Sequence, residues 1–182
     1  VQYKILKDVA GIYYKEDGKI IKNPLRGLVE DIDIFPYPLY EDLPIEKYGT
    51  EYFGATLGII SSRGCPYQCV YCAANTIHKR QYRKRSVENV LGEIEKLKYA
   101  FKAKRFSFYD DTFTLDSNRT IAICEALIDR KLNLEWNCIT RADKLTKPLL
   151  RIMKEAGRPV ALRELGMTSI MAAVRRSRRI WI

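Results

Sequence analysis

Residues Ser61 to Ala73 read SSRGCPYQCVYCA and contain three of the five cysteines in this chain of 182 residues. Three residues separate Cys65 from Cys69, and two residues separate Cys69 from Cys72. An apolar run over residues 55–60 leads directly into this segment, which we call the cysteine loop. Cysteines this close together do not suit a structural disulfide framework, and the spacing therefore predicts a metal site.

Two kinds of metal site agree with three neighbouring thiolates. Structural zinc requires a fourth ligand, and the only histidine of the chain, His78, lies six residues after Cys72. An iron–sulfur cluster held by three thiolates instead leaves one iron open to a small molecule. The cluster fits better, because the cysteine spacing is not that of the usual zinc pairs and His78 stands in a basic run.

Strand patterns and helix patterns alternate after the cysteine loop begins. We predict strands at residues 56–60, 105–109 and 134–140, and helices at residues 86–101, 117–128 and 146–157. This alternation is typical of an α/β fold with a parallel sheet and right-handed crossovers. In such sheets ligands lie at the carboxyl ends of the strands, which here carry the cysteine loop, Asp110-Asp111 and Thr140-Arg141.

The two remaining cysteines follow the apolar pattern of their own elements. Cys138 lies within the third predicted strand, and Cys124 lies within the second predicted helix. We expect Cys124 to share a buried helix face with Ile121, Leu127 and Ile128. Both cysteines are therefore predicted to be core residues and not metal ligands.

The first 48 residues form a separate compositional zone. Asp17-Gly18 stands between short apolar runs and predicts a β-hairpin, because the turn requires positive φ angles. Pro36 and Pro38 hold the stretch over residues 31–40 extended, and we predict a linker there. We also predict a fourth strand at residues 158–162 and a helix at residues 165–179.

The chain carries a formal net charge of +10, concentrated at His78–Arg85 and Arg175–Arg179. A surface for nucleic acid is one interpretation, and uneven charge on an enzyme is the other. The confinement of the excess to two short runs favours the enzyme. No stretch approaches the ~18 apolar residues of a membrane span, and no signal-peptide pattern is visible. We therefore expect a cytoplasmic protein without a membrane span.

The cysteine loop resembles the CxxxCxφC motif of the radical S-adenosylmethionine (radical SAM) enzymes, in which φ is aromatic. The resemblance implies a partial (β/α) barrel of the radical SAM type, with about four βα units here. It implies that Cys65, Cys69 and Cys72 bind a 4Fe-4S cluster and that Tyr71 lies near the adenine of S-adenosylmethionine. It also implies reductive cleavage of that cofactor to a 5′-deoxyadenosyl radical, with a flavodoxin or ferredoxin as the reductant.

Two further segments resemble the same family. Residues 108–113, FYDDTF, are similar to the DD-x-F segment of subgroups that also carry a cobalamin-binding domain. The resemblance implies that Asp110 or Asp111 accepts hydrogen bonds from the amino group of S-adenosylmethionine. Residues 136–143 resemble the third-strand segment of the family, whose arginine, here Arg141, reaches toward the site and suits a carboxylate in a forked geometry.

The resemblance covers residues 9–157 and sets the expected domains. Residues 1–50 are expected to be the connector that follows a cobalamin-binding domain, and residues 51–157 the N-terminal part of the radical SAM core. We expect the chain to be a piece of a longer protein that uses cobalamin. Residues 158–182 do not resemble the family, and a divergent end and a frameshifted end both explain them.

The leading hypothesis is a fragment of a radical SAM enzyme acting on an unknown small-molecule substrate. The subgroup implies methyl transfer or ring rearrangement. The rival hypothesis is a basic nucleic-acid-binding module stabilised by zinc, with His78 as the fourth ligand; we do not expect nucleic acid to be the partner. A third hypothesis is an inactive truncated product, whose open sheet edge predicts poor solubility.

Overall fold

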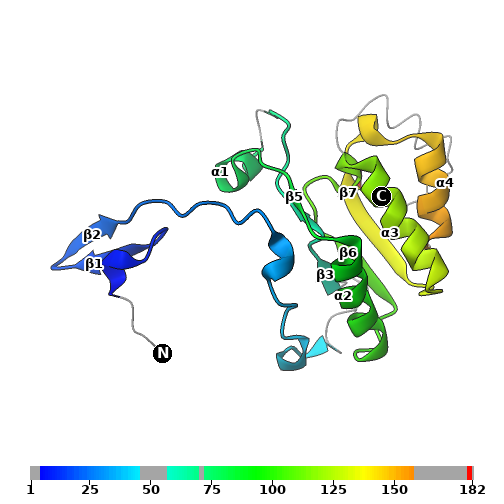
Figure 1. Ribbon diagram of the computed structural model, residues 1–182, viewed down its shortest axis with the longest axis horizontal. Helices are drawn as coiled ribbons and strands as arrows, with labels where there is room; N and C mark the ends of the chain where they lie inside the picture. The colour runs from blue at the N-terminus through cyan, green and yellow to red at the C-terminus, as the bar shows by residue number, and fades with distance from the viewer. Residues whose placement is uncertain (1–4, 46–56, 70–71, 158–179, 182) are drawn as a thin grey trace. The chain divides into compact units, whose positions relative to one another are not determined.

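The computed structural model describes residues 5–45, 57–69, 72–157 and 180–181 (Figure 1). The chain divides into two compact units, Val1–Glu30 and Asp31–Ile182. The predicted linker at residues 31–40 thus belongs to the larger unit, whereas the expected connector extended to residue 50. Short 3-10 helices link the elements: η1 (Leu6–Asp8), η2 (Ile32–Ile34), η3 (Tyr40–Asp42), η5 (Phe113–Leu115) and η6 (Ala142–Lys144).

The smaller unit contains the predicted hairpin. Strands β1 (Tyr13–Glu16) and β2 (Lys19–Lys22) pair in antiparallel register. The two turn residues, Asp17 and Gly18, both have positive φ angles, of 48° and 80°. This is the backbone that a two-residue hairpin turn requires and that Asp-Gly adopts readily, and the prediction is confirmed.

The larger unit contains a four-stranded sheet in the order β3-β6-β7-β8. Strands β3 (Leu57–Ile59), β6 (Arg105–Phe108) and β7 (Glu135–Thr140) are parallel, as predicted. The short strand β8 (Ile180–Trp181) pairs antiparallel with β7, and the sheet is therefore mixed at that edge. The predicted fourth strand and the helix that follows it lie outside the described residues.

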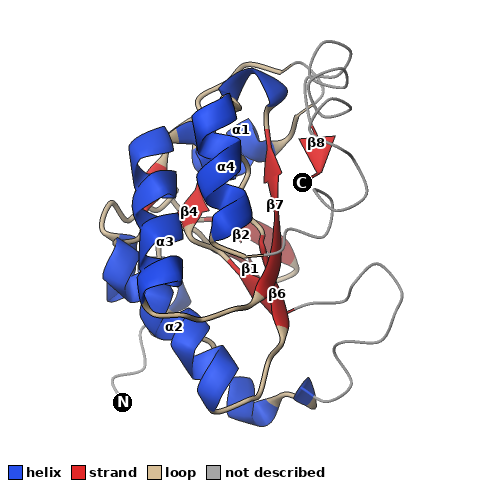
Figure 2. Ribbon diagram, turned by 90° about the vertical axis from the view of Figure 1, so that its right-hand side faces the viewer, coloured by secondary structure: helices blue, strands red, loops and turns tan. Residues whose placement is uncertain are grey.

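Three helices cover one face of this sheet: α2 (Val87–Tyr99), α3 (Ser117–Asp129) and α4 (Lys147–Glu155) (Figure 2). Each begins at a side-chain cap that accepts the backbone N–H three residues later. The caps are Ser86, Asp116 and Thr146, which are residue types preferred at this position because their side-chain oxygens accept such N–H groups. No helix in the described part of the chain is long and apolar enough to cross a membrane.

The core lies between the sheet and these helices. In β7 the side chains alternate in burial, and Trp136 and Cys138 point into the core. Phe108 stacks on Phe113 with ring centroids 4.2 Å apart. Both Cys138 and Cys124 are fully buried, which confirms that they are core residues.

One prediction about the face of α3 is wrong. Ile128 is 37% exposed, and Ile123 is fully buried in its place. The buried stripe of α3 also contains Cys124 and Leu127, and each further residue turns the helix by ~100°. Ile128 therefore lies beyond the edge of this stripe. The apolar residue that lies on the stripe, one turn before Leu127, is Ile123.

Candidate functional site

The segment that contains the cysteines is closed at its base by two short strands. Strand β4 (Ser62–Arg63) pairs antiparallel with β5 (Arg83–Lys84), with Ser62 opposite Lys84 and Arg63 opposite Arg83. The chain leaves the fold at β4 and returns at β5, and the short helix α1 (Ala74–His78) lies between them. The pairing thus holds the two ends of residues 64–82 together, and we call this segment the excursion.

Gly64, the residue after β4, packs against the returning side of this excursion at Gln81. Its φ angle is +88°, and a Cβ atom added there would overlap the carbonyl oxygen of Gln81. A backbone atom cannot move aside as the end of a flexible side chain can. Glycine is therefore required at this position both for its backbone conformation and for the close approach.

Gly64→Ala is expected to lower the free energy of unfolding by about 1–3 kcal/mol, since it adds backbone strain to a steric overlap. The matched control is Gly18→Ala, because Gly18 has a φ angle of +80° and no atom within 4 Å of an added Cβ. The control should show only the conformational cost, about 1 kcal/mol. Urea unfolding of both variants measures the difference, and equal losses would show that the approach to Gln81 is unimportant.

Cys65 lies beside the end of strand β6. Its side chain is buried, at 6% exposure, and its Sγ is 3.6 Å from the hydroxyl oxygen of Thr112. The same hydroxyl lies 2.7 Å from the carbonyl oxygen of Asp111, to which it donates a hydrogen bond. Thr112 follows β6 by four residues, and the cysteine loop therefore contacts the carboxyl end of this strand.

Cys69 lies beside the end of strand β7. The Nη1 atom of Arg141, the residue directly after β7, donates to Cys69 Sγ at 3.7 Å. The guanidinium of Arg141 also lies over the ring of Tyr67, 3.8 Å from its centroid. The cysteine loop thus spans the ends of two neighbouring strands, which is the convergence that the order of the elements predicts.

One edge of the Arg141 guanidinium already binds a carboxylate, that of Asp143 two residues later. Its Nε and Nη2 atoms donate to the two oxygens of Asp143, each at 2.9 Å. Arg141 holds the pKa of the Asp143 carboxyl below its usual range. Arg141 therefore presents its Nη1 to the cysteine loop, while its Nε and Nη2 bind Asp143.

The remaining residues of the motif are partly described. Cys72 is half-buried, and its backbone N–H donates to the carbonyl of Cys69 at 3.1 Å. Tyr71, which is expected near the adenine, lies outside the described residues. This backbone bond holds Cys69 and Cys72 close to each other.

The donor chemistry of the site fits an iron–sulfur cluster. All three cysteines of the loop are free thiols. The Arg141 guanidinium donates to the sulfur of Cys69, and the Thr112 hydroxyl oxygen lies 3.6 Å from the sulfur of Cys65. No three His, Cys, Asp or Glu side chains in the described ranges are arranged to hold a single metal ion. A cluster does not need that arrangement, because each thiolate binds a different iron.

The two aspartates after β6 have different surroundings. Asp110 is 1% exposed, and its carboxylate accepts four hydrogen bonds from Ser61 and Ser62. The carboxylate of Asp111 is half-buried and makes no hydrogen bond or ion pair with another described residue. The structure thus separates two residues that sequence reasoning treats as equivalent.

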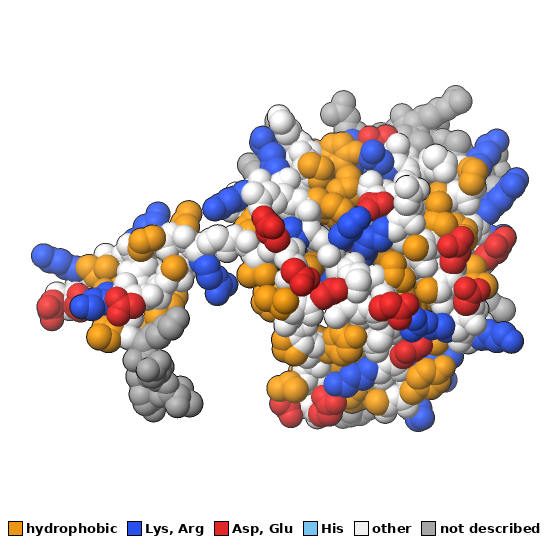
Figure 3. Space-filling model, viewed as in Figure 1, with side chains coloured by type: hydrophobic (Ala, Val, Ile, Leu, Met, Phe, Trp, Pro, Cys, Tyr) orange, Lys and Arg blue, Asp and Glu red, His pale blue; other side chains and the backbone are white. Residues whose placement is uncertain are grey.

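His78 and the end of the basic run after it contact neighbouring protein side chains. The Nδ1 atom of His78 is 3.2 Å from Nη2 of Arg83, and Lys84 forms an ion pair of 2.6 Å with Asp116. Arg85 binds the buried carboxylate of Glu93. On the face of the larger unit seen in Figure 3, acidic and basic side chains are interspersed. These contacts do not support the zinc-stabilised nucleic-acid module.

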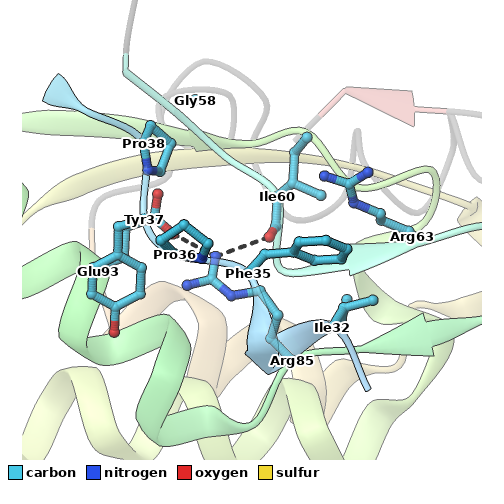
Figure 4. Close-up of a pocket in the computed structure, with 10 residues that line it drawn as sticks. All are labelled: Ile32, Phe35, Pro36, Tyr37, Pro38, Gly58, Ile60, Arg63, Arg85 and Glu93. Atoms are coloured by element: carbon cyan, nitrogen blue, oxygen red, sulfur yellow. Dashed lines mark hydrogen bonds and ion pairs between the residues drawn. The ribbon is translucent and has the colours of Figure 1, made fainter. Parts of the chain in front are cut away.

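A pocket of about 140 Å³ lies beside the start of the cysteine loop (Figure 4). The segment Phe35–Pro38 forms one wall, and Ile60 and Arg63 form another. The hydroxyl of Tyr37 donates to the carbonyl of Asn89 in α2 at 2.9 Å. The Pro-rich segment is therefore packed between α2 and the residues that lead into the loop.

The sequence profile of the radical SAM superfamily matches residues 59–178, most of the chain. This chain belongs to the radical SAM superfamily. The matched range begins in β3, directly before the cysteine loop, and includes the ends of β6 and β7 that the loop contacts. The family that the cysteine spacing indicates is thereby confirmed.

Curated relatives of this radical SAM chain include methyltransferases and cyclases. An uncharacterized methyltransferase of Pyrococcus horikoshii is 36% identical over 153 residues, which cover 84% of this chain and 33% of that protein. The anaerobic magnesium-protoporphyrin IX monomethyl ester cyclase of Rubrivivax gelatinosus is 32% identical over 153 residues, which cover 82% of this chain and 27% of that protein. The chain thus spans about a third or less of the length of these relatives.

Solved structures with a similar fold include two cobalamin-containing enzymes. The cobalamin-dependent S-adenosylmethionine radical enzyme OxsB, with aqua-cobalamin bound, aligns with a TM-score of 0.60 at 23% identity, covering 94% of this chain and 29% of that one. The methyltransferase TsrM from Kitasatospora setae, with cobalamin and a 4Fe-4S cluster bound, aligns with a TM-score of 0.54 at 18% identity, covering 62% of this chain and 22% of that one. At these identities the likeness establishes the fold.

Three site residues were missed by sequence reasoning. Thr112 contacts Cys65, and Tyr67 contacts Arg141. Ser61 donates a hydrogen bond to Asp110. Thr112 and Ser61 are small polar residues next to predicted strand ends, a position that signals a site but not a partner. The partners are brought together only by the parallel pairing of β3, β6 and β7.

Proposed function

We propose that this chain is the N-terminal part of the catalytic domain of a cobalamin-linked radical SAM enzyme. In this proposal Cys65, Cys69 and Cys72 hold a 4Fe-4S cluster, and the sheet is the first part of a (β/α) barrel. The observation that carries the proposal is the placement of the cysteine loop across the ends of β6 and β7, with Arg141 donating to Cys69.

When bound, the cluster would supply the electron that cleaves the sulfonium carbon–sulfur bond of S-adenosylmethionine and yields a 5′-deoxyadenosyl radical. The residues of this chain hold and orient the reactants. Asp111, whose carboxylate makes no hydrogen bond to another described side chain, would accept hydrogen bonds from the cofactor's amino group. Arg141 would stabilise the negative charge of the cluster thiolates, and Tyr71 would lie near the adenine.

The relatives narrow the class of reaction. They include methyltransferases and a ring-forming ester cyclase, and the structural neighbours contain cobalamin. We therefore propose that the longer protein binds cobalamin and performs methyl transfer or cyclisation on a small molecule. A flavodoxin or ferredoxin is the proposed reductant, and the cytoplasm the proposed location.

Anaerobic reconstitution of the chain with iron and sulfide tests the proposal. We expect a brown protein with about four irons and four sulfides per chain, and a change in the EPR signal of the reduced cluster when S-adenosylmethionine is added. A control reconstitution with zinc alone is expected to leave substoichiometric metal. Stoichiometric zinc binding in the absence of bound iron would contradict the cluster and favour the zinc module.

A further inference from the structure

The segment that leads from β3 into the cysteine loop is held by four buried polar side chains. These are Ser61, Ser62, Asp110 and Arg119, with exposures of 0%, 2%, 1% and 7%. We call this set the loop anchor. Buried polar groups are costly unless they are hydrogen-bonded, and a cluster of this kind therefore depends on complete pairing.

Asp110 forms the centre of the loop anchor. Its Oδ1 accepts the backbone N–H groups of Ser61 and Ser62 at 2.7 and 3.1 Å. Its Oδ2 accepts the hydroxyl groups of the same two serines at 2.6 and 2.7 Å. Each carboxylate oxygen thus has two protein donors, and the capacity of this buried group for further donors is largely used.

Arg119 joins the two sides of the excursion that carries the cysteines. Its Nη2 donates to the carbonyl of Ser61 at 2.8 Å, and its Nε donates to the carbonyl of Arg85 at 3.1 Å. The backbone N–H of Arg85 also donates to the Ser61 carbonyl at 3.0 Å. Ser61 lies directly before β4 and Arg85 directly after β5, and Arg119 therefore fastens both ends of the excursion to α3.

The side chains that follow β6 differ in burial from one residue to the next. Phe108 and Asp110 are buried, and so is Thr112, whereas Tyr109 is 50% exposed and Asp111 is half-buried. Asp110 is thus buried together with the loop anchor, whereas Asp111 is partly open to solvent.

We propose that Asp110 and Arg119 are positioning residues that fix both ends of the cysteine excursion and thereby place Cys65 and Cys69 at the ends of β6 and β7. Asp110 acts on the loop through Ser61 and Ser62 and does not bind the cofactor. The identity of the group that the cysteines hold rests on the proposed function. The positions of the loop-anchor residues do not depend on the proposed function.

Alkylation of the metal-free chain tests this proposal without any cluster. In Asp110→Ala we expect Cys65 to react with iodoacetamide about tenfold faster than in the unchanged chain, because the reaction of a buried thiol requires local opening. Cys124 and Cys138, both fully buried in the core, are internal standards in the same sample and should keep their rates. Mass spectrometry of the peptides measures each rate.

Two further variants separate positioning from cofactor binding. In Asp110→Asn the amide oxygen can still accept both N–H groups, and its NH₂ can donate to the serine hydroxyls after these rotate. This variant should therefore restore most of the Cys65 protection. Asp111→Ala should leave Cys65 protected, and after reconstitution it should keep its cluster but lose the EPR change caused by S-adenosylmethionine.

An unchanged Cys65 rate in Asp110→Ala would overturn the proposal. If Asp110→Ala raises the alkylation rates of Cys65, Cys124 and Cys138 together, the variant has lost its fold. The milder variant Ser62→Ala, which removes a single hydroxyl of the loop anchor, then tests the proposal. A selective rise at Cys65 in Ser62→Ala supports positioning, and the absence of such a rise overturns it. Failure of the unchanged chain to bind iron would instead contradict the proposed function, and the alkylation result would stand.

Discussion

Cys69→Ala is expected to abolish the stable 4Fe-4S cluster that we propose for this chain, while Cys124→Ala is expected to retain it. Two thiolates are too few to hold a cubane that already leaves one iron open. The Sγ of Cys69 is also the atom that receives the Arg141 hydrogen bond. Its loss therefore removes a ligand together with the contact that orders the loop against β7.

Cys124 is the matched control because it is a free cysteine in the same chain with no access to the site. It is fully buried in α3, and burial raises the pKa of its thiol to about 12, which keeps it protonated at neutral pH. Iron and sulfide analysis and the visible absorption of the reconstituted variants measure the effect. A full cluster in Cys69→Ala, or its loss in both variants alike, would contradict the ligand assignment.

Glu93→Ala is expected to lower the free energy of unfolding by about 3–5 kcal/mol, because it leaves the Arg85 charge without its buried partner. The side chains of Glu93 and Arg85 are 2% and 11% exposed, and they form an ion pair. The hydroxyl of Tyr40 also donates to Glu93 Oε1 at 2.5 Å. Arg85 in turn donates to the carbonyl of Ile60, directly before the cysteine loop (Figure 4).

Glu88→Ala in the same helix is the control for Glu93→Ala. Glu88 is paired with Arg130 at 2.6 Å but is 78% exposed, and such surface pairs contribute about 0–1 kcal/mol. Urea unfolding at neutral pH measures both variants. The double variant Arg85→Met/Glu93→Met should recover much of the loss, since it leaves no unpaired charge. Similar losses for Glu93→Ala and Glu88→Ala would show that the pair is not effectively buried.

Local signals were sufficient for most of the regular structure. The caps Ser86, Asp116 and Thr146 and the turn at Asp17-Gly18 were predictable, because each acts through hydrogen bonds or backbone angles within a few residues. The buried face of α3 was harder to predict from the sequence, since apolar residues lie on both sides of its buried stripe. Only contact with the sheet and with α4 decides between Ile123 and Ile128.

The sequence alone also determined the family and the donor set of the candidate site. Three cysteines at this spacing, placed between a strand and repeated βα units, indicated an iron–sulfur site and the radical SAM superfamily, because ligand number and spacing are properties of a short segment. The convergence of the strand ends followed from the order of the elements, since parallel strands align their carboxyl ends.

The tertiary structure decided which partners the candidate site residues have. Asp110 and Asp111 are adjacent carboxylates, and nothing local distinguishes them. Pairing of β3 with β6 brings Ser61 and Ser62 against the buried Asp110, whereas Asp111 stays half-buried. Likewise the fork of Arg141 binds Asp143, while its Nη1 meets Cys69, 72 residues earlier in the chain. Such choices depend on groups that are distant in sequence and close only after folding.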